Sequence, residues 1–280
     1  MIPRFFFIIL IFELNKILKM KKQLILGTLF ATIFFACKND VKKTADKETT
    51  PIEETIAISS TKITPISHAT AVIEFDDTMM YLDPTGGSEA FNDFENAHYV
   101  LITDIHGDHM DKETLAGLDL ENTTIIAPEA VAKQLSDLKV KEIIVINNNE
   151  EKSFGNFKVE AIPMYNLREE ALKFHPKGRG NGYVLTIDNE RIYFSGDTED
   201  IPEMRNLKNI DKAFVCMNLP YTMTVESAAD AVLAFKPTKV YPYHYRGTEG
   251  LSDVEKFKTI VNEKNTDIEV VQWNWYPNRK

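Results

Sequence analysis

The sequence predicts a mixed α/β protein in which β-sheets are covered by helices. The region from about residue 58 onward begins with short runs rich in β-branched and aromatic residues, separated by turn residues. Further along the chain, such runs alternate with amphipathic stretches of helical length. The composition, 44% hydrophobic and 26% charged, is ordinary for a globular protein. This order of elements favours sheets packed against helices over an all-β sandwich.

The first half of this region predicts six strands and two helices. The turn residues Asp76, Asp77 and Thr78 join the second strand to the third. Pro128 marks the start of the second helix, because a proline is tolerated in the first helical turn. The predicted strands are Lys62–Ser67, Ala71–Phe75, Met79–Leu82, Tyr99–Thr103, Thr123–Ala127 and Lys141–Ile146, and the predicted helices are Asp111–Leu118 and Pro128 to about Leu138.

The second half predicts a longer series of strands with two helices between the last of them. Asp188 and Asn189 are typical of a hairpin turn and connect two neighbouring strands. The predicted strands are 153–154, Phe157–Ile162, Gly182–Ile187, Arg191–Phe194, Ala213–Met217, Val240–Tyr243 and Glu269–Trp273, and the predicted helices are Val225–Phe235 and Ser252–Asn262.

Residues 1–36 are typical of a targeting segment and are kept out of the fold. Met20, the start that we favour, is followed by two lysines and then by an apolar run from Leu24 to Ala36. The small residue before Cys37 resembles the end of a bacterial lipoprotein signal peptide, in which this cysteine is lipidated. An uncleaved membrane anchor is the alternative, but the run is shorter than the ~20 residues that a spanning helix needs.

Residues 37–60 are rich in Lys, Thr and Glu and predict a flexible tether, because this composition cannot bury a core. Residues 61–280 form the predicted globular domain. We therefore expect a protein of the bacterial cell envelope, attached to the membrane by a lipid anchor at Cys37, on the periplasmic side or at the outer membrane.

Charge and cysteine content exclude some classes of function. The formal net charge of -10 argues against nucleic acid as the main partner, since its backbone requires a basic surface. The two cysteines, Cys37 and Cys216, imply no disulfide framework. Cys216 lies in an apolar run and is predicted to be a small core residue.

The segment Leu101–His109 predicts a metal site. A buried strand ends there in a polar turn in which Gly107 is expected to allow a tight bend. Imidazole and carboxylate are the ligands that catalytic zinc and related metals use. The alternative is a solvated acidic turn followed by a helix N-cap. Four potential ligands lie within six residues: Asp104, His106, Asp108 and His109.

Three later strands also end in a potential ligand. These ligands are Asn166, Asp197 and His244. Each is weak evidence alone, because a single histidine or aspartate at a strand end is usually a hydrogen-bonded surface or core residue. Their order along the chain after the dense His/Asp cluster strengthens the metal hypothesis.

With this order of sites, the chain resembles the metallo-β-lactamase superfamily, whose fold is a four-layer αββα sandwich holding one or two metals at one edge. Within the superfamily it looks most similar to the branch of ascorbate-6-phosphate lactonase-like hydrolases and N-acylphosphatidylethanolamine-type phospholipase D. The resemblance covers about Thr61 to Trp275. It is carried by His68–Ala71, Leu82–Pro84, Ile105–His109, His175–Gly180, Ser195–Thr198 and Pro242–Tyr245.

The resemblance implies a ligand for each metal position. His106 would bind the first metal, Asp108, His109 and His244 would hold the second, and Asp197 would bridge the two. Asp104 stands where the family has its first histidine, and Asn166 stands at its isolated middle histidine.

These two departures affect only the first metal. A carboxylate at Asp104 can still coordinate, which favours manganese or iron over the zinc otherwise expected. The amide of Asn166 is a poorer ligand, so the first site is either weak or empty at low metal supply. His175 is a possible replacement ligand, although its neighbours Lys177 and Arg179 indicate a substrate loop instead.

The chemistry expected of such a site is hydrolysis of an ester, lactone or phosphodiester by a metal-bound water. Asp108 is the candidate catalytic residue, which orients the water or accepts its proton. The alternatives are a non-catalytic or single-metal ligand-binding envelope protein, and a phospholipid-specific phosphodiesterase.

The expected substrate is a small or lipid-derived molecule, and the oligomeric state is left open. The predicted substrate-binding residues are His175, Lys177 and Arg179, whose loop could equally be an exposed basic hairpin, together with His68 and Tyr221, for which ordinary strand-end and rim packing are the alternatives.

Overall fold

The computed structural model describes residues 61–277. The predicted signal peptide over residues 1–36, the start at Met20, the lipidated Cys37 and the tether over residues 37–60 all lie outside the described residues. Within the described range, no helix is both long and apolar enough to cross a membrane.

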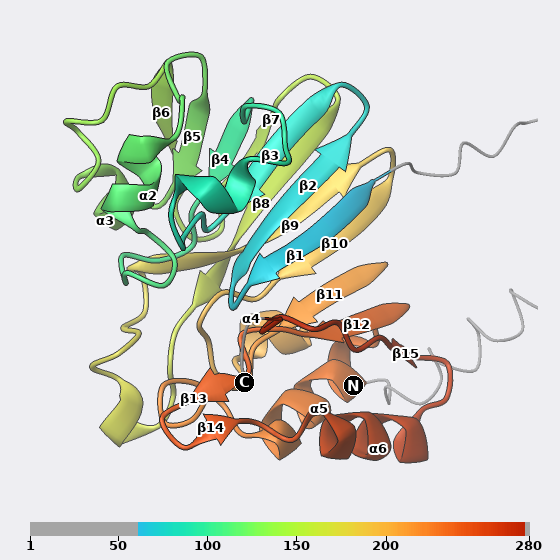
Figure 1. Cartoon of the computed structure of the whole chain (residues 1–280). Helices are drawn as coiled ribbons and strands as arrows, with labels where there is room; N and C mark the ends of the chain where they lie inside the picture. The colour runs from blue at the N-terminus through green and yellow to red at the C-terminus, as the bar shows by residue number, and fades with distance from the viewer. Residues whose placement is uncertain (1–60, 278–280) are drawn as a thin grey trace, which may run out of the picture. The chain divides into compact units, whose positions relative to one another are not determined.

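The first sheet has six strands in the order of the chain (Figure 1). Each of its first three strands is antiparallel to the next, whereas the third to sixth strands are parallel to one another. The strands are β1 (Lys62–Ser67), β2 (Thr70–Phe75), β3 (Thr78–Leu82), β4 (Tyr99–Leu101), β5 (Thr124–Ala127) and β6 (Glu142–Val145).

The second sheet has seven strands in the order β15-β12-β11-β10-β9-β8-β7. Strands β7 to β10 pair antiparallel, whereas β10, β11, β12 and β15 are parallel. The strands are β7 (Glu151–Ser153), β8 (Phe157–Met164), β9 (Gly180–Ile187), β10 (Glu190–Phe194), β11 (Lys212–Val215), β12 (Lys239–Pro242) and β15 (Glu269–Val270), and a separate hairpin is formed by β13 (Arg246–Gly247) and β14 (Gly250–Leu251).

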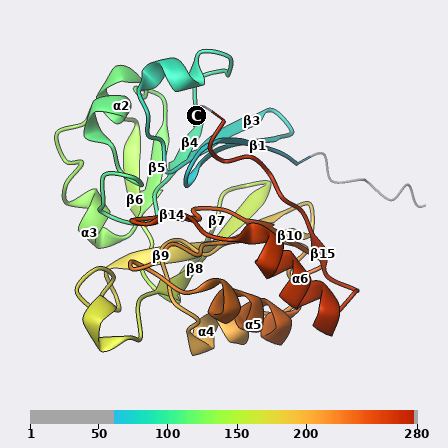
Figure 2. The ribbon, with the colours of Figure 1, turned by 60° about the horizontal axis from the view of Figure 1, so that its bottom comes forward.

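Helices cover the outer face of each sheet (Figures 1 and 2). Side chains alternate along the strands, so that Ile73 of β2 lies in the core between the sheets while Val72 packs toward the helices outside the first sheet. The four-layer αββα arrangement that was expected is therefore confirmed. The helices are η1 (Ser88–Phe91), α2 (Lys112–Gly117) and α3 (Glu129–Ala132) on the first sheet, α4 (Pro202–Arg205), α5 (Val225–Phe235) and α6 (Val254–Lys264) on the second, and η2 (Glu169–Ala171) between β8 and β9.

The strand directions bring the predicted ligands to one edge of the sandwich. In the first sheet, β1 and β4 run in the same direction as β3, and in the second sheet β8, β10 and β12 are parallel to one another. Five of these strands, β1, β4, β8, β10 and β12, are each followed by at least one of the polar residues singled out above. The sheet topology therefore explains why residues far apart in sequence meet.

Several predicted elements differ from the observed ones by one or two residues at an end, and two are too long by three residues or more. The helix expected from Pro128 to about Leu138 ends at Ala132, after which the amides of Gln134 and Leu135 bond three residues back in successive turns. The polar residues that follow, among them Ser136 and Asp137, favour such turns over a longer helix.

The last strand, expected over Glu269–Trp273, ends at Val270. The Val271 amide still bonds to the Val240 carbonyl oxygen, but beyond it the pairing ends, and the Trp273 ring packs against Tyr241 with the two ring centroids 4.5 Å apart. The short helix α4 and the hairpin β13–β14 were not predicted at all.

Candidate metal centre

The loop after β4 distinguishes between the two interpretations of this segment, a cluster of metal ligands and a solvated acidic turn followed by a helix N-cap. The N-cap of α2 is Asp111, whose side chain accepts hydrogen bonds from the backbone amides of Glu113 and Thr114. The capping role is thus filled by a residue outside the cluster. Asp104 and His109 are fully buried, which a solvated acidic turn would not require.

His109 is held by a buried carboxylate and turns one free nitrogen toward the other candidate ligands. Its Nδ1 donates to Asp83 Oδ2 at 2.8 Å, and Thr103 Oγ1 donates to the same oxygen at 2.6 Å. The Nε2 atom of His109 then lies 3.5 Å from Asp197 Oδ2. A carboxylate that orients a histidine through its second nitrogen is the usual support of a metal ligand. The sequence analysis assigned Asp83 no such role.

Asp197 lies at the centre of the cluster and faces three histidines. Its Oδ2 is 3.3 Å from His175 Nε2, and its Oδ1 is 3.3 Å from His244 Nε2. Burial opposes ionisation of this carboxyl, but His244 and His109 outweigh burial and hold the pKa of Asp197 well below its usual range. Asp197 is therefore a carboxylate, the form that binds a metal.

His109 shows the complementary effect. Burial lowers the pKa of His109, but the carboxylates of Asp197 and Asp83 outweigh burial and raise this pKa well above its ordinary value. The raised pKa of His109 shows that the two carboxylates create a negative potential at this buried nitrogen, and such a potential attracts positive charge.

His244 and Asp108 form the outer part of the cluster with His68. Asp108 Oδ2 lies 3.4 Å from His244 Nε2 and 3.3 Å from His68 Nε2. Burial and the neighbouring His244 lower the pKa of His68 to about 4, so this ring is neutral near pH 7. The Asp108 carboxylate can only accept, which assigns the proton of the neutral ring to Nε2, and Nδ1 then accepts from the hydroxyl of Tyr276, 2.7 Å away.

Asp104 is held by two charged hydrogen bonds from Arg179 and by a close contact with His106. Arg179 donates to it through Nε at 3.1 Å and Nη2 at 2.9 Å, and His106 Nδ1 lies 2.7 Å from Asp104 Oδ2. Arg179, which was predicted to bind substrate, is thus engaged by a candidate ligand. Lys177, predicted to act with it, is exposed and pairs with Glu203 at 2.7 Å.

His175, rather than Asn166, lies among the candidate ligands. Its Nδ1 is 3.2 Å from the carbonyl oxygen of Tyr221, to which it can donate, so that Nε2 is left toward Asp197 and is 3.9 Å from Asp104 Oδ2. The Asn166 amide donates to the carbonyl oxygens of Ala171 and Tyr221, and contacts only the Nδ1 side of the His175 ring. The structure therefore places the expected amide ligand beside the ring and brings His175, expected as either a substrate residue or a replacement ligand, into the cluster.

Buried atoms without hydrogen-bond partners provide a test of whether the cluster fits a metal. Within residues 61–277, five such atoms belong to the cluster: His109 Nε2, His175 Nε2, Asp197 Oδ1 and both ring nitrogens of His244; Asn166 Oδ1, beside His175, is a sixth. A buried polar atom left unpaired costs about 1–3 kcal/mol, so this many in one place require an explanation. Divalent cations would satisfy His109 Nε2, His175 Nε2, Asp197 Oδ1 and one ring nitrogen of His244.

The ligand atoms also group at distances compatible with metal binding. Three sets of residues each bring their ligand atoms within 4.8 Å of one another: His68, Asp108 and His244; Asp104, His106 and His175; and His109, Asp197 and His244. Histidine nitrogen with carboxylate oxygen is a donor set that suits zinc, iron and manganese. The residues present therefore fit one or two divalent ions.

Comparison with known families agrees with this geometry. Residues 77–245 match the family model described as "Beta-lactamase superfamily domain". The chain belongs to the metallo-β-lactamase superfamily. A "UPF0173 metal-dependent hydrolase" of Pyrococcus horikoshii is 31% identical over 215 residues, which are 72% of this chain and 93% of that protein. The chain is a metal-dependent hydrolase of this superfamily and is grouped with the UPF0173 proteins.

Solved structures show the same fold. A crystal structure from Parabacteroides distasonis, of a protein described as a metal-dependent hydrolase, has a TM-score of 0.68 and 39% identity and covers 76% of this chain and 92% of its own. The structure of Igni18, a metallo hydrolase from Ignicoccus hospitalis, has a TM-score of 0.63 and 20% identity, covering 76% of this chain and 94% of its own. At that lower identity the likeness concerns the fold alone.

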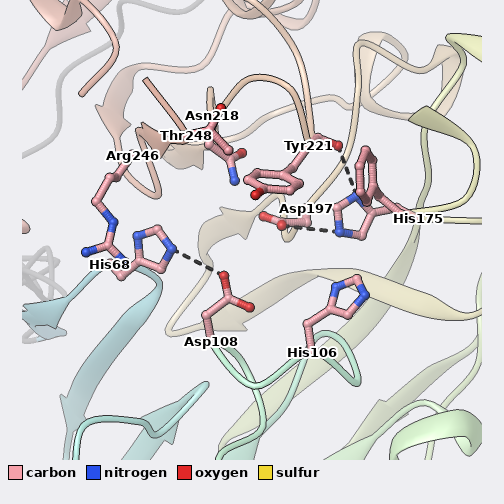
Figure 3. Close-up of a pocket in the computed structure, with 11 residues that line it drawn as sticks. His68, His106, Asp108, His175, Asp197, Asn218, Tyr221, Arg246 and Thr248 are labelled. Atoms are coloured by element: carbon pink, nitrogen blue, oxygen red, sulfur yellow. Dashed lines mark hydrogen bonds and ion pairs between the residues drawn. The ribbon is translucent and has the colours of Figure 1, made fainter. Parts of the chain in front are cut away.

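A cavity of about 440 Å³ opens over the cluster of candidate ligands around Asp197 (Figure 3). His68, His106, Asp108, His175 and Asp197 line it. Tyr221, predicted to line the pocket, does so, and its ring meets that of Phe174 edge-on at a centroid distance of 5.1 Å. The lining also includes residues that the sequence analysis did not assign: Asn218, Arg246, Gly247 and Thr248.

Proposed function

We propose that the protein hydrolyses an ester, lactone or phosphodiester of a small or lipid-derived molecule, with one or two divalent ions held by the cluster around Asp197. The observation that carries this proposal is the cluster of buried, unpartnered ligand atoms on His109, His175, Asp197 and His244, two of which, His175 and Asp197, line a cavity that a small molecule can enter. A metal bound there would polarise the scissile carbonyl or phosphoryl oxygen and lower the pKa of an attacking water.

The chain supplies two sets of ligands around Asp197. The first set is Asp104, His106 and His175, and the second is Asp108, His109 and His244. Each set combines two histidines with one carboxylate, which is the composition of many catalytic zinc sites. We therefore propose zinc, with manganese and iron as the alternatives that metal analysis would distinguish.

Asp108 is the residue that we propose to orient the attacking water. Its side chain is 45% exposed, whereas that of Asp197 is only 4% exposed, so Asp108 reaches both the cluster and the solvent of the cavity. Burial opposes its ionisation, but hydrogen bonds from His244 and His68 lower the pKa of Asp108 below its usual range. Asp108 then acts as a permanent hydrogen-bond acceptor for water rather than as a strong base.

Metal analysis combined with an activity panel tests the proposal. Purified protein should contain one or two equivalents of a divalent metal and hydrolyse at least one member of a panel of aryl esters, lactones and aryl phosphodiesters. Asp197→Asn should lose metal and activity together, because the bridging carboxylate is removed while the shape is kept. Tightly bound metal with no turnover across the panel would reject the hydrolytic function.

A phospholipid phosphodiesterase is the second candidate function. Leu219 and Leu251 are exposed and line a hollow next to the catalytic cavity, with which it shares Gly247 and Thr248. Exposed leucines beside a polar site suit an amphipathic substrate. This candidate also agrees with the proposed lipid anchor at Cys37 and the cell-envelope location. Comparing vesicle-bound phospholipid with a water-soluble phosphodiester would separate the two functions, and Cys37→Ala should release the protein from the membrane fraction.

A further inference from the structure

The three cations near the catalytic cavity differ in what engages them. Lys177 pairs with Glu203, and Arg179 is held by Asp104. Arg246 lines the cavity, and in the part of the chain that the structure describes no carboxylate lies within ion-pair distance of it. Its guanidinium instead lies over the ring of Tyr276, 5.7 Å from the centroid. Arg246 is therefore the cation that remains for a ligand.

Arg246 is held in place by the backbone rather than by a salt bridge. The hairpin β13–β14 begins with it and packs on the turn at Leu219, whose carbonyl oxygen accepts a hydrogen bond from the Thr248 amide at 3.2 Å. A Cβ atom at Gly247 would lie 1.8 Å from the same oxygen, so the hairpin approaches this turn as closely as only glycine allows. Arg246 is fixed at its base while its head is free.

Two neutral donors share the cavity wall with Arg246. Asn218 Oδ1 accepts a hydrogen bond from Thr222 Oγ1, which leaves the amide NH₂ group of Asn218 as the end available to a ligand. Thr248 adds a hydroxyl on the same wall, and Figure 3 shows both residues across the cavity from Asp108. A guanidinium accompanied by neutral donors is suited to an anion with two or three oxygens.

We propose that the substrate carries a carboxylate or phosphate group that Arg246 binds, with help from Asn218 and Thr248, while its scissile bond lies over the Asp197 cluster. This proposal rests on the proposed hydrolytic function and names its substrate class. An anionic end bound by Arg246 orients the substrate from the wall opposite the ligands. The positive charge of Arg246 would allow a chain of net charge -10 to accept such a substrate.

Ligand pairs that differ in one charged group test the proposal by binding alone. Glutarate and glutaramate differ by a carboxylate, and 4-phosphooxybutyrate and 4-hydroxybutyrate differ by a phosphate. Calorimetry on the metal-loaded protein should show the more charged member of at least one pair bound about tenfold or more tightly, as charge-assisted hydrogen bonds predict. In Arg246→Gln the ratio of the two dissociation constants within a pair should fall to about one. The pair whose ratio falls further identifies the anion.

Two controls separate the role of Arg246 from general effects. Lys139→Gln removes one positive charge beside a different hollow, lined by Leu115 and Leu118, and should keep the wild-type ratio. Arg246→Lys keeps the positive charge but loses the paired N–H donors of the guanidinium, so it should retain part of the preference for the more charged ligand. Ratios near one in the wild type, or equal ratios in the wild type and Arg246→Gln, would overturn the anion site. An intact ratio without any hydrolysis would instead overturn the proposed function and leave the anion site standing.

Discussion

At the scale of single residues, the candidate ligands depend on neighbours that are not ligands themselves. Asp83 fixes the ring of His109, and the Tyr221 carbonyl fixes that of His175. In both rings the bonded nitrogen is Nδ1, which leaves Nε2 for the cluster. Orientation by a second contact reduces the conformational freedom that metal binding would otherwise have to remove.

Asp83→Asn should weaken metal binding without changing the fold. The amide keeps the size of the carboxylate but loses the charge that supports the His109 ring, and losses of about 10–100-fold in metal affinity are typical for such contacts. Competition against a chromophoric chelator measures the affinity, and circular dichroism reports the fold. Unchanged affinity would show that the contact between Asp83 and His109 is structural only.

His175→Gln and Asn166→Ala distinguish the geometry in the structure from the ligand set expected from the sequence. If His175 is a ligand, its variant should lose more than about tenfold in affinity for one metal, while Asn166→Ala should lose less because its amide bonds to backbone carbonyls. Metal stoichiometry by mass spectrometry and the same chelator competition provide the measurements. The opposite ranking would restore Asn166 as the ligand.

At the scale of elements, strand periodicity predicted most of the fold. The strand Lys62–Ser67 and the helix Val225–Phe235 have the bounds that the sequence predicted. The apolar residues of Val225–Phe235 repeat with the helical period, and the β-branched residues of Lys62–Ser67 favour a strand; both signals are local. Ligand identity in the loop between β8 and β9 was not predictable in this way. His175 meets Asp197 because η2 turns the chain back toward the cluster, and no local pattern encodes that return.

The role of Gly107 also required the structure. The sequence analysis expected this glycine to permit a tight bend, but its φ angle is outside the left-handed region and a Cβ atom there would meet nothing within 4 Å among the described atoms. Gly247, which the sequence did not single out, has the steric constraint instead.

The two glycines form a matched pair for a stability measurement. Gly247→Ala should lower the free energy of unfolding by about 1–3 kcal/mol, the usual cost of forcing an atom into a packed contact, or displace the β13–β14 hairpin. Gly107→Ala should change it by much less. Urea denaturation followed by circular dichroism measures both variants. A similar loss in the two would mean that close approach to the Leu219 carbonyl is not what selects Gly247.

At the scale of the whole domain, the cluster joins the two sheets. His109 follows a strand of the first sheet, whereas Asp197 and His244 follow strands of the second. The sequence supplied the strands and most of the candidate ligands, but the meeting of the two halves follows from the topology. A cation held by ligands from both sheets would connect them in the folded state and not in the unfolded chain.

Metal removal should therefore destabilise the entire domain rather than a single loop. A ligand present at about a thousand times its dissociation constant stabilises the folded state by about 4 kcal/mol, so chelation should lower the melting temperature by several degrees and zinc should restore it. Differential scanning calorimetry on the full chain measures the shift. In Asp197→Asn, the carboxylate common to both ligand sets is absent, and the melting temperature should respond weakly to chelator and zinc. A wild-type melting temperature that is the same with saturating zinc and with chelator would mean that the cluster holds no ion that bridges the sheets.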